Sequence, residues 1–296
     1  MKTLFRTLQF VVMGALLSGT FLLTSCKDDN DGPKDDGKVD PGTVASTNLV
    51  AYFPFEDNGN DAVGSLVPSS SPNVSYVAGR RNKAYQGAEN GYFMYDLPTG
   101  SKLKDLKAFS IAMWFYCPPA LDGVPPVPGI WQINGTSDAV WGNMCLTLDR
   151  MPEAADSLNI KMVFHKEGVG WANQFVGFSN PAFIENKWFH VIFSYDNVAS
   201  KYMVYVNGTP LTLSDGITNR YESDAVPPVA LGDLAFVDAS KLCIGAWMEK
   251  ALGNRNDEWM GWFTGKIDEL RVYDKGLSST EAKALFDAEV TQLTEE

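Results

Sequence analysis

The sequence predicts an all-β protein in which two antiparallel sheets form a jelly-roll sandwich, with one short helix near the C-terminus. Three observations support this fold class. Short segments with alternating apolar and polar residues recur along the chain, with turn residues between them. One amphipathic helix follows the last of these segments. The chain lacks the regular alternation of strands and helices that is typical of a parallel sheet.

Composition narrows the possible functions. The 296 residues are 45% apolar and 12% aromatic, which is enough for a large core. The net charge of −12 argues against binding to nucleic acids or anionic membranes, because both require basic patches. The charge is compatible with neutral glycans or with a cation. The only histidines are His165 and His190, so a His-rich transition-metal site is not expected.

Residues 1–25 are predicted to be a lipoprotein signal peptide. Lys2 and Arg6 form a positively charged start, an apolar stretch runs over 10–23, and small residues precede Cys26. Cys26 is therefore the expected lipidation site, which would anchor the protein to a membrane without spanning it. The alternative is an ordinary secretory signal with an incidental cysteine.

Residues 26–46 are predicted to be the lipidated cysteine and a disordered acidic tether, because Asp, Gly and Pro dominate and little can be buried. The run KDDND after Cys26 resembles the surface-export signal of Bacteroidetes lipoproteins, and a plain spacer is the alternative. We expect one folded domain over 47–296, anchored in the outer membrane and exposed at the cell surface.

The first half of the domain supplies several strands. The segment 49–55 alternates, and Pro54 places it at a sheet edge or at a strand end. A glycine-punctuated pair of strands is expected within 79–97. The run 109–117 has no polar break and therefore predicts a central strand that is buried on both faces.

The second half contains the clearest hairpin, formed by 188–195 and 201–207. Asn207-Gly208 then favours a two-residue type I′ turn into 210–213. Residues 214–240 are expected to be an insertion loop. The remaining predicted strands are 129–134, 141–149, 159–164 and 241–246.

The segment 265–274 is predicted to be the last strand. Regular alternation would place Ile267, Glu269, Arg271 and Tyr273 on one face, and Asp268, Leu270 and Val272 on the other. The predicted helix begins after a cap at Ser278 or Ser279, with Glu281 in its first turn.

This ending, GKIDELRVYD followed by KGLSSTEAKALF, resembles that of the laminin-G-like, concanavalin A-like jelly rolls of bacterial surface proteins. LVAYFPFEDNGND, FSIAMWFYC and WFHVIFSYD resemble further blocks of the same family. The resemblance covers roughly 47–290 and implies the concanavalin A-like topology. The resemblance indicates mainly the fold, because proteins of one fold can have many different functions.

The sequence gives no positive case for catalysis. Glycosidases of this superfamily carry Glu-x-Asp-x-x-Glu on one strand, and that spacing is missing here. Asp268 and Glu269 are adjacent and would face opposite sides of a regular strand. His190 fits a core position better than a catalytic base. We therefore expect a protein that is not an enzyme, with an unrecognised hydrolase or lyase site as the remaining alternative.

The resemblance implies one Ca²⁺ between the loop after the first strand and the last strand. The matching residues are Asp57, Asn60, Asp61 and Asp268, all of which offer oxygen ligands. The match is imperfect, because Glu56 stands where the family often has Asp. The alternative is that the loop residues form a polar turn and Asp268 bonds backbone groups.

The chain contains eight tryptophans, and indole rings stack on sugar rings. The loop residues Trp171, Trp247 and Trp259 are the candidates for glycan binding, because loops carry ligand contacts on rigid sandwiches. Trp114 and Trp188 lie on predicted strands and are expected in the core, an explanation that is open for the loop residues too. Among Cys117, Cys145 and Cys243, one disulfide or three buried thiols are both possible.

The leading functional hypothesis is a non-catalytic carbohydrate-binding surface lipoprotein that captures glycans at the outer membrane. A protein–protein adhesion or accessory module on the same fold is the alternative. The expected partners are a glycan or protein ligand outside the cell and outer-membrane lipid through the acyl anchor, with no nucleic acid.

Overall fold

The computed structural model describes residues 39–118, 127–135, 140–150, 157–169, 175–222 and 226–294. The predicted signal peptide, Cys26 and most of the predicted tether lie outside the described residues, as does Trp171. Among the described residues, no helix has the length and apolar character needed to cross a membrane.

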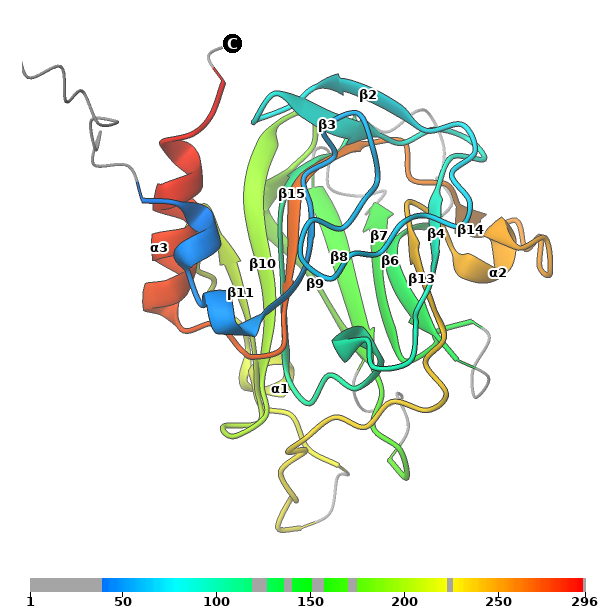
Figure 1. Cartoon of the computed structure of the whole chain (residues 1–296). Coiled ribbons are helices and arrows are strands. Elements are labelled where there is room, and N and C mark those ends of the chain that lie inside the picture. The colour runs from blue at the N-terminus through cyan, green and yellow to red at the C-terminus, as the bar shows by residue number, and fades with distance from the viewer. Residues whose placement is uncertain are drawn as a thin grey trace, which may run out of the picture. The chain divides into compact units, whose positions relative to one another are not determined.

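Two antiparallel sheets form the sandwich (Figure 1). Sheet A has the order β12-β11-β10-β5-β15-β3-β2, and β1 also pairs with β15. Its strands are β1 (Leu49–Phe53), β2 (Ser75–Ala78), β3 (Lys83–Gln86), β5 (Phe109–Tyr116), β10 (Trp188–Asp196), β11 (Lys201–Val206), β12 (Thr209–Pro210) and β15 (Lys266–Tyr273).

Sheet B has the order β4-β13-β6-β7-β8-β9, with the short β14 parallel to β6. Its strands are β4 (Phe93–Asp96), β6 (Val127–Asn134), β7 (Met144–Arg150), β8 (Ser157–Phe164), β9 (Phe175–Ile184), β13 (Lys241–Ile244) and β14 (Met260–Gly261). The helices are α1 (Asp215–Thr218), α2 (Met248–Ala251) and α3 (Ser279–Val290), with short 3₁₀ turns at Pro41–Thr43, Ser46–Asn48 and Lys102–Lys104. The predicted fold class is therefore confirmed.

The main core lies between the two sheets and is rich in aromatic rings. Phe53 of sheet A packs against Tyr95 and Trp131 of sheet B, with ring centroids 5.3 and 6.4 Å apart. β5 lies between β10 and β15, and its residues are buried along almost its whole length, as its continuous apolar run predicts. β1 ends at Phe53, directly before Pro54, because proline cannot donate to a ladder.

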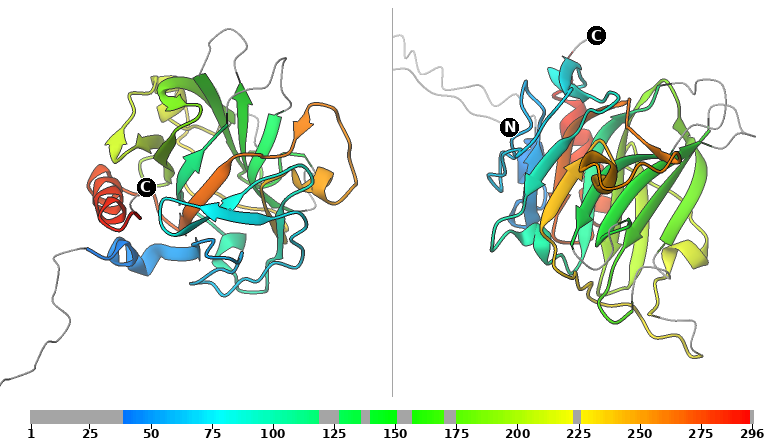
Figure 2. Two further views of the ribbon diagram at one scale, coloured as in Figure 1. Left: turned by 90° about the horizontal axis from the view of Figure 1, so that it is seen from above. Right: turned by 90° about the vertical axis from the view of Figure 1, so that its right-hand side faces the viewer.

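The α3 helix covers the outer face of sheet A (Figures 1 and 2). Leu277, Ala282 and Leu285 pack with residues of β5, β10 and β11, including Ala112 and Tyr205. This second layer explains why a central strand of sheet A is apolar on both faces.

The predicted helix cap is confirmed at Ser278. Its Oγ accepts the backbone N–H of Glu281 at 3.3 Å, and the Glu281 side chain accepts the backbone N–H of Ser278 at 2.9 Å. This reciprocal pair is a capping box, and it satisfies N–H groups that the first helical turn leaves free.

A β-bulge at Glu269 interrupts the alternation of β15. Glu269 has a φ of 53°, and the pairing with β5 shifts register between Asp268 and Arg271. As a result Ile267 belongs to the main core together with Leu270, whereas Arg271 faces α3. The prediction that Asp268 and Glu269 face opposite sides is wrong, because the extra residue of a bulge resets the alternation.

The structure adds elements that the sequence analysis missed. β2 and β9 were not predicted, and the expected pair within 79–97 is β3 and β4, which belong to different sheets. The 214–240 segment includes α1, and its Leu231 and Leu234 are fully buried in the core. Cys117, Cys145 and Cys243 are all buried, and no disulfide joins them to one another.

Candidate functional site

An aromatic cluster lies on the outer face of sheet B, beside α2. Trp247 and Trp259 meet edge to face with centroids 5.0 Å apart, and Trp141 lies 5.5 Å from Trp247 and 6.4 Å from Trp259. The two predicted residues Trp247 and Trp259 are thus brought together. They differ in exposure, since Trp259 is 40% exposed and Trp247 only 1%.

Backbone pairing holds this cluster in place. The Trp247 indole Nε1 donates to the Val127 carbonyl at 2.7 Å, and the Val127 N–H donates to the Trp259 carbonyl at 2.7 Å. Both bonds fix the loop to the start of β6. Trp247 is therefore a buried support for its neighbours, and its predicted role as a sugar-stacking surface does not fit its burial.

The Trp259 ring is the accessible part of the cluster. Trp141 is half-buried, and its ring plane is inclined by 28° to that of Trp259. Trp141 was not among the predicted glycan-binding residues. Its nearness to Trp259 depends on the pairing of β6 with β7 and β14, which the local sequence does not encode.

A second aromatic pair lies on the other side of α2. Tyr92 and Trp262 stack with centroids 6.2 Å apart and planes 14° apart. The Lys250 ammonium lies 5.5 Å from the Trp262 ring and donates to the Met260 carbonyl at 2.6 Å. This lysine therefore ties α2 to β14, which directly precedes Trp262.

Polar residues directly precede the exposed indole in the chain. The loop between α2 and β14 carries Asn254, Arg255, Asn256, Asp257 and Glu258, most of them exposed. The Arg255 Nε donates to Asp257 Oδ2 at 2.6 Å. Amide, carboxylate and guanidinium groups beside an indole are what a hydroxyl-bearing ring needs for orientation.

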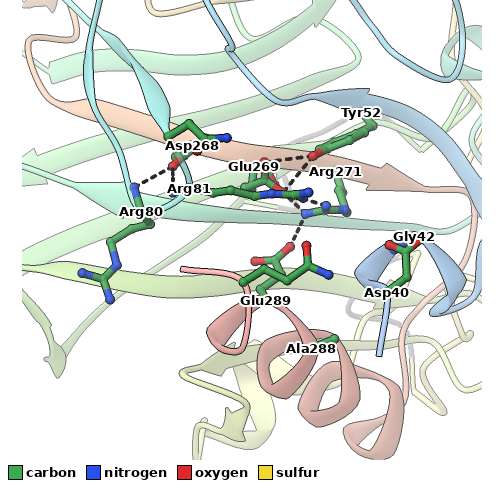
Figure 3. Close-up of polar contacts among 12 residues, drawn as sticks. Asp40, Gly42, Tyr52, Arg80, Arg81, Asp268, Glu269, Arg271, Ala288 and Glu289 are labelled. Carbon is green, nitrogen blue, oxygen red and sulfur yellow. Dashed lines mark hydrogen bonds and ion pairs between the residues drawn. The ribbon is translucent and has the colours of Figure 1, made fainter. Parts of the chain in front are cut away.

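A buried charge network lies on the outer face of sheet A (Figure 3). The Arg271 guanidinium forms ion pairs with Glu289 of α3 and with Glu269, the latter at 2.7 Å, and lies 4.1 Å from the Tyr52 ring. The Tyr52 hydroxyl donates to Glu269 at 2.8 Å. Burial raises the pKa of Glu289 to about 7, while Arg271 opposes the shift.

His190 closes the network from β10. It is fully buried, its Nε2 lies 3.3 Å from Glu289 Oε2, and burial lowers its pKa to about 3, with Arg271 acting in the same direction. Trp114 and Phe286 pack against the imidazole ring. A neutral, solvent-excluded histidine cannot reach a substrate, which fits a structural role.

The residues predicted to bind calcium are not brought together. Asp61 Oδ1 accepts the backbone N–H groups of Tyr52 and Val63 at 2.9 Å each, and Asp61 lines a cleft of about 380 Å³. Asp57 is exposed and lies 3.6 Å from the Lys83 ammonium, and Asn60 is exposed too. In the parts of the chain that the structure describes, no three His, Cys, Asp or Glu side chains are grouped to hold a metal ion.

Asp268 instead holds the loop between β2 and β3. Its Oδ2 accepts the backbone N–H groups of Arg80 and Arg81 at 2.7 and 2.9 Å, while Oδ1 is buried without a hydrogen bond. Glu56 holds the other end of that loop through the Lys83 N–H at 3.2 Å. The four predicted residues therefore do not fit one calcium site, and calcium binding stays a prediction.

The carboxylates Asp268 and Glu269 share a face because of the bulge, yet they do not form an accessible acid–base pair. Both are buried, and both contact Arg81, Asp268 through the backbone N–H and Glu269 through the guanidinium at 3.4 Å. Burial raises the pKa of Asp268 to about 8. The pair has no room for a glycosidic bond between its members.

Comparisons with known proteins identify the scaffold. The family model described as the concanavalin A-like lectin/glucanases superfamily matches residues 89–283. No curated protein matches the sequence of this chain.

Solved structures give the same fold. The botulinum neurotoxin type G receptor binding domain superposes with a TM-score of 0.53 and 12% identity, covering 81% of this chain and 51% of that one. The binding domain of botulinum neurotoxin DC, in complex with rat synaptotagmin II, has a TM-score of 0.55 and 14% identity, covering 83% and 52%. The same domain in complex with SialylT gives equal values. The chain spans about half the length of these domains, and likeness at such identity shows the fold alone.

Proposed function

The chain belongs to the concanavalin A-like lectin/glucanases superfamily, and we propose that it is a non-catalytic carbohydrate-binding module whose ligand stacks on Trp259. In this proposal the domain is attached through Cys26 to the outer membrane of a Bacteroidetes-type cell and faces outward. It captures glycans there. No step of bond cleavage is assigned to it.

The observation that carries the proposal is the exposed indole of Trp259 on a rigid support. An aromatic ring that is already fixed loses little conformational freedom when a sugar stacks on it. Trp247 fixes Trp259 from below, and the bond between Val127 and the Trp259 backbone fixes its position along the sheet. The polar residues 254–258, which directly precede Trp259 in the chain, offer hydrogen-bonding groups.

The electrostatic background favours an uncharged ligand at this site. The chain carries 36 acidic and 24 basic residues, and the loop beside Trp259 contains Asp257 and Glu258 next to Arg255. Stacking and hydrogen bonds to hydroxyl groups do not require a net charge on the ligand. A neutral polysaccharide therefore suits the site better than an anionic one.

A protein partner is the second candidate, and a separate surface favours it. Val226, Val229 and Tyr221 are 96%, 52% and 39% exposed, and they lie on one segment that follows β11 and α1. Exposed apolar side chains that lie close together in the sequence are typical of protein contacts. The binding domain of botulinum neurotoxin DC has the same fold and was solved in complex with rat synaptotagmin II, which supports a protein as the partner.

The test is affinity electrophoresis of the full chain, with Cys26→Ser to prevent lipidation, in gels that contain neutral polysaccharides. We expect retardation that Trp259→Ala weakens at least tenfold, which corresponds to about 1.4 kcal/mol of lost binding free energy. Tyr221→Ala is the matched control, since it removes an aromatic ring of similar exposure from a different surface.

Each lane is run with calcium and with chelator, and the products are assayed for new reducing ends. Loss of retardation in chelator would support the predicted calcium. New reducing ends would contradict a non-catalytic role. Retardation unchanged by Trp259→Ala would remove Trp259 from the site, and no retardation on any glycan would favour the protein partner.

A further inference from the structure

A row of outward-facing side chains crosses five neighbouring strands of sheet A, beyond the end of α3. The pairing registers connect the members in turn, because Ser75 pairs with Gln86, Gln86 with Lys266, Lys266 with Tyr116, and Tyr116 with Trp188. We call these five residues the outer row.

The outer row faces away from the core. The residues next to its members along three strands, Tyr85, Ile267 and Phe115, belong to the main core. Because successive side chains of a strand point to opposite faces, the outer row lies on the external surface of sheet A. Trp188, which was predicted to be a core residue, is only half-buried.

The α3 helix covers the adjacent row and not this one. Phe286 of α3 packs against Trp114 and His190, with centroids 5.9 and 5.8 Å away. Trp114 and His190 are both buried. Tyr116 and Trp188 lie two residues away from them on β5 and β10, on the same face, and retain solvent-accessible surface.

The aromatic part of the outer row carries a cation. The Lys266 ammonium lies 4.7 Å from the Tyr116 ring centroid and 6.0 Å from that of Trp188, and the two rings are 5.6 Å apart. In the described part of the chain Lys266 forms no ion pair with a carboxylate. The Arg80 guanidinium, 5.1 Å from the Trp114 ring, adds a second positive group nearby.

A cation without a carboxylate partner is informative in a chain with a net charge of −12. No member of the outer row is acidic, and Lys266 is its one charged member. Adjacent strands are about 4.8 Å apart, so five strands span roughly 19 Å, enough for several sugar rings in line. Flat aromatic rings with a cation beside them match a ring that carries a carboxylate.

We propose that the outer row binds an acidic polysaccharide built of uronic-acid units. One sugar ring stacks on Trp188, whose plane is inclined by 54° to that of Tyr116, and its carboxylate pairs with the Lys266 ammonium above Tyr116. Ser75 and Gln86 lie further along the same line. Ser75 contacts a hydroxyl group of a following unit, and Gln86, whose Nε2 donates to the Thr264 carbonyl at 2.9 Å, accepts from a hydroxyl group through its Oε1. This surface is on the other sheet from Trp259, so it acts independently of the site proposed above.

The probes are polygalacturonate, alginate and fully methyl-esterified polygalacturonate, each cast into affinity gels with the full chain carrying Cys26→Ser. We expect retardation by at least one acidic polymer and none by the neutral ester. Lys266→Met, which keeps an apolar stem over the rings, should abolish the retardation. Trp188→Ala should weaken it at least tenfold, and raising the salt concentration should weaken it too.

Lys266→Arg keeps the charge and should retain binding, which separates loss of the cation from misfolding. Thermal unfolding of each variant checks the fold. Trp259→Ala should leave binding of the acidic polymer unchanged, so failure here and failure of the Trp259 site are distinguishable. Equal binding by Lys266→Met, equal binding of the neutral ester, loss on Trp259→Ala, or no binding of either acidic polymer would overturn the proposal.

Discussion

The outer faces of the two sheets differ in what covers them. Sheet A is covered over much of its outer face by α3, which has 12 residues and brings Glu289 onto Arg271. Within the described residues, the helix on the outer face of sheet B is the four-residue α2, next to an exposed indole at Trp259. The two helices lie on opposite sides of the sandwich (Figures 1 and 2).

This difference separates stability from recognition. Under α3, charged groups are removed from water and therefore require every partner, because an unpaired buried charge is strongly destabilising. Beside α2, aromatic rings rest on a fixed backbone, and the outermost ring contributes little to the core. We therefore expect substitutions under α3 to change folding and substitutions at Trp259 to change binding.

Among the substitutions that test this difference between the two faces, Arg271→Met should have the largest effect on stability. It leaves Glu269 and Glu289 buried without their cation and should lower the free energy of unfolding by about 3–5 kcal/mol. Denaturant unfolding followed by tryptophan fluorescence measures this loss. Lys283→Ala, which removes an exposed ion pair with Asp287, is the control and should cost less than about 0.5 kcal/mol.

Adding Glu289→Gln to Arg271→Met should restore part of the lost stability, because one of the two buried carboxylates that have lost their cation is then removed. If Arg271→Met alone lowered the free energy of unfolding by less than about 1 kcal/mol, the expected difference between the two outer faces would be contradicted, because the charge network would then contribute little to stability.

The next effect is a dependence on pH through Asp268. Its pKa is raised from 3.8 to about 8 in the folded chain, so the folded state binds more protons than the unfolded state between these values. The contribution of Asp268 to the free energy of unfolding is full below pH 3.8 and is lost as the pH rises to about 8. Asp268→Asn does not titrate and should gain stability relative to the wild type from pH 5 to 8.

That gain should be on the order of 2–4 kcal/mol, since each unit of pKa difference corresponds to about 1.4 kcal/mol. Unfolding midpoints at pH 5, 6.5 and 8 test it. The same substitution at the exposed Asp287 is the control. Parallel pH curves for the wild type and Asp268→Asn would show that Asp268 does not titrate in this range.

The smallest effect concerns the start of α3. Ser278→Ala removes the side-chain half of the capping box and should cost about 1 kcal/mol of unfolding free energy. Thr280→Ala, at an exposed position in the first turn, should cost less. Because α3 closes only sheet A, glycan retardation should be unchanged in both variants. Loss of retardation in Ser278→Ala would contradict the independence of the two faces.

The sequence by itself determined features that depend on neighbouring residues. Ser278 and Glu281 are three residues apart, which is the spacing of a capping box, and Asn207-Gly208 adopts the positive φ angles of 48° and 73° that its predicted turn requires. The unbroken apolar run of β5 likewise predicted its central place. In each case the deciding interaction lies within a few residues of the chain.

Only the tertiary structure decided which residues are accessible and which act together. Trp247 and Trp259 look alike as loop tryptophans, but one is buried by bonding to β6 and the other is exposed. The bulge at Glu269 moved two carboxylates to one face. Its partner Tyr52 is 217 residues away in the chain, although Arg271 lies only two residues further along the same strand. Burial and pairing depend on distant segments, and no local pattern records them.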